Sequence, residues 1–330
     1  MAHELDFSNA QANIAVVGEA PWHKLGQTLE PGQSIEVWAK AAGLAHEVRR
    51  ASVEYKTDDE MKMFADREVL YRSDNLKPLG VVGRRYKIVQ PSHVLDFFAK
   101  LAEHNSFELE TAGSLSDGKR IWALAKVSDG APIIGADVIK PYVLLATSYD
   151  GTMATTARLT SVRVVCSNTL GYAEKEAGDI IRIQHSAEFK AEETRMDLGI
   201  ALTAFDRFLI DARRLAKRQI NEDFAIEFLR QLLPASVSVK TDKAGIKTTA
   251  PVPVEETRAF TAIMDLFKGE AIGHGLPEAK GSAWSLLNAT TQYYDHVNGR
   301  NADTRMSSAW FGTGNAIKTK ARDWLMEVVA

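Results

Sequence analysis

Basic and aromatic side chains gather in three places along the sequence, and together they suit one kind of ligand. Single-stranded nucleic acid is bound by cationic grooves that follow the phosphates and by aromatic faces on which bases stack. The alternative is a structural role, because amphipathic helices commonly bury aromatic rings of this kind. The three clusters are Arg84, Arg85, Tyr86 and Lys87; Tyr149, Arg158 and Arg163; and Trp284, Tyr293, Tyr294, His296, Arg300, Arg305, Trp310 and Phe311.

The residues that enzymes use for catalysis do not occur in the spacings that catalysis needs. No G-x-S-x-G elbow is present, and the eight histidines never fall into H-x-x-x-H or H-E-x-x-H spacing. The single cysteine, Cys166, excludes an intrachain disulfide and fits a buried structural residue better than an activated thiolate. Asp295 and His296 are adjacent, and helix neighbours do not face each other, so a helix cap or a core pair is favoured over a metal site. We expect no catalytic residue, no metal and no cofactor.

A glycine-rich stretch at 269–284 invites comparison with phosphate-binding loops. The order that such a loop needs is G-x-x-x-x-G-K-[ST], but here Lys280 precedes Gly281. Two interpretations stay open: a connecting loop, which we favour, or an anion site on the free N–H groups of a helix that begins at Gly281-Ser282.

The segment 142–165 predicts an antiparallel hairpin around Asp150-Gly151, the residues that a two-residue type I′ turn prefers. In that register Tyr149 faces Thr152. Alternate side chains then form one apolar face and a second face that is polar, aromatic and basic, open to water or to a ligand. The second face carries Thr147, Tyr149, Thr152, Thr156, Arg158 and Thr160.

The first half of the sequence predicts a sheet around this hairpin. Alternating patterns predict strands at 46–56, 67–74 and 79–90, and a helix begins at Pro91. Strands resume on either side of a turn at 115–118.

The second half predicts helices. Apolar residues at 198–216 step by three and four, with Arg207, Arg213, Arg214, Lys217 and Arg218 on the flanks of that helix. Further helices are expected at 224–233, 255–268, 283–297 and 315–328. We therefore predict an α+β fold, with a mainly antiparallel sheet and a crossing helix in the N-terminal half and helices in the C-terminal half. The expected division is a sheet domain at 1–185 and a helical region at 186–330, with a mobile surface loop at 235–254.

Composition narrows the class of protein without choosing a function. The 330 residues are 45% apolar and 25% charged, which are ordinary globular values. The N-terminal residues do not resemble a signal peptide, and no apolar run approaches the length of a membrane span, so we expect a cytoplasmic protein with no membrane partner. The net charge of -3 argues against a uniformly basic protein but allows a local basic groove.

Several motifs resemble one known family, the phage/plasmid-like proteins catalogued as domain of unknown function 932. The matching segments are PWHKLGQTL at 21–29, SYDGTMATTARLTSVRVVCSNTL at 148–170, AWSLLNATTQYYDH at 283–296 and SSAWFGTGNAIK at 307–318. The resemblance covers nearly the whole chain. One departure is Gln292, where the family pattern implies an acidic residue.

The resemblance implies an origin in a phage or plasmid, where proteins often anneal single strands during recombination. Such annealing proteins share a small sheet crossed by a helix, and the hairpin followed by a helical start at Asn168 is similar in outline. Our first hypothesis is therefore a homo-oligomer that binds single-stranded DNA, with Arg158 and Arg163 on phosphates and Tyr149 or Trp284 stacking on bases. The candidate nucleic-acid-binding residues are Arg84, Arg85, Tyr149, Arg158, Thr160, Arg163, Asn168, Trp284, Arg300 and Arg305.

Two alternatives come from other classes of function. The first is a non-enzymatic phage or plasmid factor that binds a host protein through the helical half and the loop at 235–254. The second is an enzyme acting on nucleic acid, which would need a metal held by distant residues such as Asp295 and His296. The spacing of these residues disfavours the enzyme.

Overall fold

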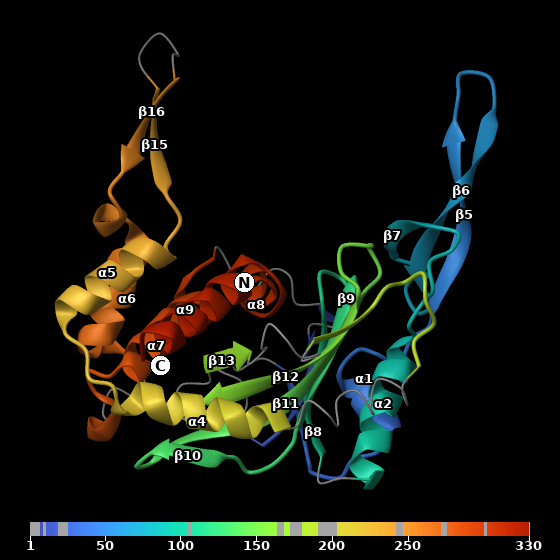
Figure 1. The fold of residues 1–330 in the computed structure, drawn as a ribbon. Helices are drawn as coiled ribbons and strands as arrows, with labels where there is room; N and C mark the ends of the chain where they lie inside the picture. The colour runs from blue at the N-terminus through green and yellow to red at the C-terminus, as the bar shows by residue number, and fades with distance from the viewer. Residues whose placement is uncertain are drawn as a thin grey trace. The chain divides into compact units, whose positions relative to one another are not determined.

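The chain folds into two compact units, each assembled from separate stretches of sequence. The computed structural model describes residues 7–8, 11–18, 26–104, 107–163, 168–171, 180–190, 203–241, 247–271, 276–299 and 302–329. Unit 1 comprises Met1–Gly130, Lys140–Ser161 and Tyr172–Phe205, and unit 2 comprises Ala131–Ile139, Val162–Gly171 and Asp206–Ala330. Sheet and helix are both abundant, which confirms the predicted α+β class (Figure 1).

Unit 1 is built on a sheet with the strand order β12-β11-β9-β8-β3-β4. Strand β8 pairs antiparallel with β3 and β9, β9 with β11, and β12 with β14, whereas β3 and β4 are parallel. The sheet is therefore mainly antiparallel, as predicted. Its strands are β3 (Ile14–Val17), β4 (Gln27–Leu29), β8 (Glu108–Leu115), β9 (Arg120–Lys126), β11 (Asp137–Ser148), β12 (Thr155–Arg163) and β14 (Ile180–Ile183), and a short ribbon of β1 (Phe7–Ser8) and β2 (Gln11–Ala12) precedes them.

Helix α2 (Pro91–His104) is the crossing helix that the sequence predicts, and it packs on β8 and β9. Proline suits its first position because the missing N–H has no intrahelical partner there. Val94, Leu95, Phe98 and Leu101 are buried at helical spacing, so the apolar stripe faces the sheet. Helix α1 (Ile35–Ala41) packs beside α2.

The connection between β11 and β12 is longer than predicted. Strand β11 ends at Ser148 and β12 begins at Thr155, so a loop replaces the two-residue turn. Of the pair Asp150-Gly151, only Gly151 has a positive φ, whereas a type I′ turn needs both. The Asp150 carboxylate instead accepts hydrogen bonds from the Thr152 N–H (3.0 Å) and hydroxyl (2.6 Å). This local bond favours the wider loop.

The polar face predicted for this hairpin is not open to solvent. Thr147, Tyr149, Thr156, Arg158 and Thr160 are buried, and only Thr152 in the loop is exposed. Short polar side chains tolerate burial when they are hydrogen-bonded. The hydroxyls of Thr147 and Thr155 lie 2.9 Å apart, and the Thr156 hydroxyl donates to the Ala154 carbonyl (2.9 Å). The polar side chains of these strands therefore form hydrogen bonds inside the unit.

A second sheet of unit 1 contains β5 (Val48–Lys56), β6 (Met61–Arg72) and β7 (Pro78–Gly83), all antiparallel. The three strands confirm the predicted segments, but β6 begins six residues before the predicted start at 67, and β7 ends at Gly83. There the Tyr86 N–H donates to the Gly83 carbonyl (3.0 Å) and turns the chain. Strands β5 and β6 extend beyond β7 as a two-stranded arm (Figure 1).

Unit 2 is mainly helical. Helices α6 and α7 each continue into a π-helical turn, at Leu266–Glu270 and Tyr293–Val297. The helices predicted at 224–233, 255–268, 283–297 and 315–328 are confirmed with small shifts, and α8 was missed. The helices are α4 (Thr203–Lys217), α5 (Glu222–Leu232), α6 (Arg258–Asp265), α7 (Ala283–Gln292), α8 (Ala302–Phe311) and α9 (Thr313–Val329), with 3-10 turns at Val254–Glu256 and Pro277–Ala279.

Two segments of unit 2 differ from their predicted structure. The expected loop at 235–254 is a hairpin of β15 (Ser236–Thr241) and β16 (Lys247–Val252), whose alternating Ser and Val residues follow the period of a strand. The helical start expected at Asn168 is instead a strand, β13 (Asn168–Gly171), which packs on α7 and α9.

Strand β10 (Ala131–Ile134) pairs with the first residues of β11.

A buried ion pair lies between the π-helical turn and α9. The Lys318 ammonium is 2.6 Å from the Asp295 carboxylate, and both side chains are almost fully enclosed. Helix α7 beside them is buried along its whole length, including its polar residues Asn288, Thr290 and Thr291. The hydroxyls of Thr290 and Thr291 donate to carbonyls one turn earlier, which satisfies them inside the helix.

No helix among the described residues is long and apolar enough to span a lipid bilayer.

Removing one partner of the buried pair should cost far more stability than removing both. Lys318→Met leaves the Asp295 charge buried without its cation, and we expect the free energy of unfolding to fall by about 3–5 kcal/mol. The double variant Lys318→Met/Asp295→Leu should regain more than half of that loss. Urea unfolding followed by tryptophan fluorescence measures both. Equal losses in the single and double variants would contradict a coupled pair.

Candidate nucleic-acid interface

The two aromatic residues predicted to stack on bases are both buried. The Tyr149 hydroxyl donates to the Val89 carbonyl (2.8 Å), and burial raises the pKa of this phenol well above its usual value, so it stays a neutral donor. In unit 2 the Trp284 N–H donates to the buried Asp137 carboxylate (2.9 Å), and its ring meets the edge of Phe208. The prediction that these rings face a ligand is therefore wrong, because each is held in a core by its polar atom.

The predicted residues of β12 and β13 do not form an exposed basic surface. Arg158 and Thr160 are buried. Arg163 ends β12 and Asn168 begins β13, but the positions of their side chains are not among those described. Cys166 and Arg300 lie outside the described residues. Arg305 on α8 is half-buried and donates to the Asn298 carbonyl (3.1 Å), so its guanidinium is turned towards the backbone of its own unit.

Arg84 and Arg85 are exposed, as an interface would require. They occupy the turn after β7 and are followed by Tyr86, whose ring stacks on His185 at 4.2 Å between centroids. The Tyr86 hydroxyl donates to the Ser148 carbonyl, which fixes the turn to the sheet of unit 1. Among described residues, no carboxylate lies within ion-pair distance of Arg84, Arg85 or Lys87. This turn is a small unneutralised cationic cluster.

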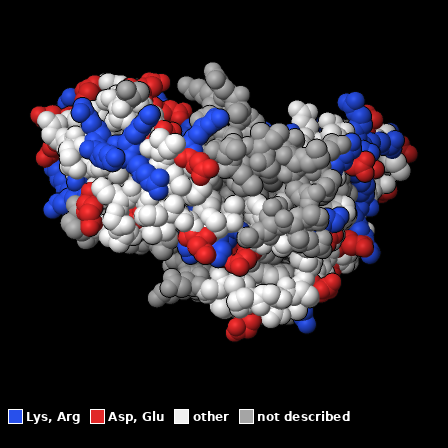
Figure 2. Space-filling model, turned by 60° about the horizontal axis from the view of Figure 1, so that its bottom comes forward, with Lys and Arg blue, Asp and Glu red and all other residues white. Residues whose placement is uncertain are grey.

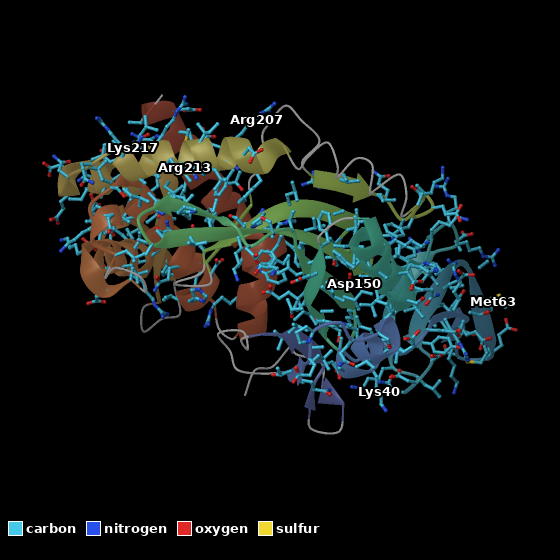
Figure 3. The ribbon with its side chains drawn as sticks, turned by 90° about the horizontal axis from the view of Figure 1, so that it is seen from below. Lys40, Met63, Asp150, Arg207, Arg213 and Lys217 are labelled. Atoms are coloured by element: carbon cyan, nitrogen blue, oxygen red, sulfur yellow. The ribbon has the colours of Figure 1, made fainter. Side chains whose placement is uncertain are left out.

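A larger cationic surface follows helix α4. Phe208, Leu209, Ala212, Leu215 and Ala216 are buried and hold one face of the helix against its unit. The opposite face is exposed, and we call its basic residues the α4 cationic face: Arg207, Arg214, Lys217 and Arg218. With a rise of 1.5 Å per residue, this face spans about 16 Å along the helix axis. Figure 3 shows Arg207, Arg213 and Lys217 spaced along α4, and in Figure 2 blue side chains gather over this helix.

Three residues of the α4 cationic face, Arg214, Lys217 and Arg218, differ from other basic residues of unit 2 because no described carboxylate pairs with them. Arg230 pairs with Glu255 (2.6 Å), and Lys268 pairs with Glu222 (2.5 Å). Within the described part of the chain, no carboxylate lies within ion-pair distance of Arg214, Lys217 or Arg218. Arg213 is oriented differently, because its guanidinium donates to the Pro132 carbonyl (2.9 Å). An unneutralised group of cations on one face attracts anions more strongly than paired cations do.

The glycine-rich loop adds one cation at the end of α4. The Ile220 N–H donates to the Gly281 carbonyl (2.9 Å), and the Ala283 N–H donates to the Arg218 carbonyl (2.8 Å), which brings the exposed Lys280 to the C-terminal end of α4. Ser282 caps α7 and is fully buried, and its hydroxyl accepts from the Ser285 N–H (3.1 Å). Because these N–H groups already have partners, the loop fits a connection better than an anion site at the helix terminus.

The metal ligands that an enzyme would need are not assembled in the described residues. No group of three or more His, Cys, Asp or Glu side chains there could hold a metal ion. Asp295, one of the two residues considered for that role, pairs with Lys318.

The sequence contained the α4 cations but gave no reason to select them. Basic residues on the flanks of an amphipathic helix are typical of an ordinary solvated face. What distinguishes Arg214, Lys217 and Arg218 is that no described acid approaches them, and this depends on residues far away in the sequence.

Comparison with known proteins gives one match. The profile of the family described as domain of unknown function (DUF932) matches residues 78–310. Neither the curated proteins nor the solved structures contain a match.

Tyr149 should contribute to stability and not to ligand binding. Tyr149→Phe removes the hydroxyl and leaves the Val89 carbonyl buried without that donor, so we expect the free energy of unfolding to fall by about 1–3 kcal/mol. Affinity for a single-stranded oligonucleotide should not change. Urea unfolding and fluorescence anisotropy measure the two effects. Unchanged stability together with weaker binding would restore Tyr149 as a ligand contact.

Proposed function

We propose that this chain, a member of the DUF932 family, binds single-stranded nucleic acid through the α4 cationic face. DNA is the proposed partner, and strand annealing in recombination by a cytoplasmic phage or plasmid protein is the proposed setting. No catalytic residue, metal or cofactor enters this function.

The observation that carries the proposal is the group of unneutralised cations at the C-terminal end of α4, namely Arg214, Lys217 and Arg218. Arg and Lys side chains supply most protein contacts to phosphates, and each contact releases counterions from the nucleic acid. Arg218 directly follows α4 and its N–H donates to the Arg214 carbonyl (3.2 Å), so Arg214 and Arg218 lie one turn apart on the same side as Lys217. A surface of this kind can follow a backbone of regularly spaced phosphates without reading its sequence.

The preference for a single strand comes from the likeness in outline to annealing proteins, which is carried by the antiparallel sheet crossed by α2 and not by Asn168, where the chain forms a strand. Phosphate contacts by themselves position a nucleic acid and do not choose between one strand and two. The Arg84–Arg85 turn is a separate unneutralised cluster in unit 1.

The salt dependence of binding tests the α4 cationic face directly. For single strands, the logarithm of the association constant falls with the logarithm of salt concentration by about 0.7 for each phosphate contact. The variant Arg214→Gln/Lys217→Gln/Arg218→Gln should therefore reduce the slope by about 2 and weaken binding at low salt. Fluorescence anisotropy with a labelled oligonucleotide, titrated at several salt concentrations beside a duplex, gives the slope and the strand preference.

A matched control removes cations that are already paired. Arg230→Gln/Lys268→Gln lowers the positive charge of the same unit, but these residues are neutralised by Glu255 and Glu222, so the slope should stay close to that of the unchanged protein. A loss of slope equal to that of the α4 variant would show that only total charge matters. Absence of binding at low salt would reject nucleic acid as the ligand and favour a host-protein partner.

A further inference from the structure

The small sheet of unit 1 has an exposed apolar face. Val81 is 55% exposed and Tyr55 is 47% exposed. Val81 pairs with Val69, and Val69 pairs with Ala51, so these three side chains project from one side of the sheet. Strand β5 runs without a break from Val48 to Lys56, so the alternation of side chains places Tyr55 on that side too. We call this side the arm face, because it continues along the β5–β6 arm.

The β5–β6 arm, residues 54–64, carries the aromatic part of the arm face. Tyr55 pairs with Lys62 across the arm, and Phe64 lies two residues beyond Lys62, so Phe64 points to the same side as Tyr55. The two exposed rings are 6.5 Å apart in an edge-to-face pair. Contiguous exposed apolar groups of this kind mark surfaces that bind a partner.

The tip of the arm is acidic. The Thr57 N–H donates to the Glu60 carbonyl (2.9 Å), and this closes a turn in which Asp58 and Asp59 are exposed. Glu60 is neutralised by Lys62 (3.0 Å). In the part of the chain that the structure describes, no basic group lies within ion-pair distance of Asp58 or Asp59.

The base of the arm face is basic. Arg67 pairs with Gly83 and precedes Val69 by two residues, so its exposed side chain lies on the apolar side of the sheet. No carboxylate among the described residues lies within ion-pair distance of Arg67. The turn with Arg84 and Arg85 follows Gly83 at the edge of the sheet and extends the positive charge there. One surface therefore carries unneutralised acids at one end and unneutralised bases at the other.

A surface with such ends is complementary to itself. A two-fold axis brings the same patch of two copies together, so that each end of one copy meets the opposite end of the other. At the base Ser52 pairs with Glu68, and Asp58 lies six residues further along, so roughly 20 Å separate base and tip. Tyr55 lies midway between Ser52 and Asp58. An antiparallel arrangement therefore brings the aromatic midpoints and both charged ends together at once.

We propose that the chain forms a two-fold symmetric dimer, in which the arm face of one copy packs against the arm face of the other. Tyr55 and Phe64 of each copy contact the same residues of its partner, and the acidic turn of each lies against Arg67 and the Arg84–Arg85 turn of the other. Nucleic acid is a poorer occupant of the arm face because the acidic turn repels phosphate.

The size of the arm face limits the strength of the dimer. The length and spacing of its strands give roughly 400 Å², less than the 800 Å² or so that each partner buries in an interface of standard size. The dimer should therefore exchange reversibly with the monomer as concentration changes. The proposal does not depend on nucleic-acid binding, and its tests use the protein alone.

Sedimentation velocity over a range of protein concentrations tests the proposal. The unchanged protein should approach the mass of a dimer and stop there. The variant Tyr55→Thr/Phe64→Thr keeps strand-forming residues and should raise the dissociation constant by about tenfold or more. The matched control Met61→Thr/Met63→Thr removes exposed apolar surface from the opposite side of the arm and should dimerise normally (Figure 3 labels Met63). Circular dichroism confirms that each variant is folded.

An exchange of charge between two copies tests the antiparallel arrangement. Asp58→Lys/Asp59→Lys makes both ends of the arm face basic, and Arg67→Glu/Arg84→Glu/Arg85→Glu makes both ends acidic, so each variant alone should dimerise poorly. In an equimolar mixture every acidic end meets a basic end, so a dimer of the two variants should form. A protein that stays monomeric at all concentrations, a mixture that stays monomeric, assembly beyond the dimer, or a methionine control as weak as the aromatic variant would overturn the proposal.

Discussion

The buried pair of Lys318 and Asp295 is the constraint on which the helical unit depends. Burying an ammonium and a carboxylate is costly unless each neutralises the other, so α9 and the end of α7 have to meet in one register. Asp295 is the next-to-last residue of one family motif, at 283–296, and Lys318 ends another, at 307–318. Strand β13, which holds the Asn-Thr-Leu of a third motif, packs on both helices. Gln292, the departure from the family pattern, is buried three residues before Asp295 and adds no further charge.

Much of the fold could be predicted because the determining signals are local. Pro91 and the apolar stripe after it identified α2, and alternation identified β5, β6 and β7 and four strands of the larger sheet, β8, β9, β11 and β12, but not β3, β4 or β14. The errors arose where one local signal has two structural outcomes. Asp150-Gly151 suits a tight turn, but its carboxylate also supports the wider loop that Thr152 closes. The two prolines in 235–254 favoured the prediction of a loop over the strand indicated by the alternation of Val237 and Val239. Edge strands tolerate proline, and the segment forms a hairpin.

The candidate site was less predictable because burial and neutralisation are properties of the folded chain. Tyr149 and Trp284 have the chemistry of stacking residues, and nothing nearby in sequence reveals that Val89 and Asp137 hold them in a core. Sequence reasoning also failed to select residues on α4, because Arg214 and Arg218 have the pattern of an ordinary solvated flank. These two arginines differ from other basic residues because no described carboxylate lies within ion-pair distance of them. The spacing of residues along the helix does not reveal this.

The π-helical turn after α7 constrains how this part of the chain can change in length. A π turn accommodates one extra residue within a helix, so Tyr293–Val297 sets the direction in which Asp295 points. Deleting one residue there would restore the ordinary winding and change the direction in which Asp295 points relative to α7. Substitutions across this turn preserve the direction of the carboxylate, whereas a single-codon deletion would not. Related chains should therefore vary here in side chain while keeping the same number of residues between Trp284 and Asp295.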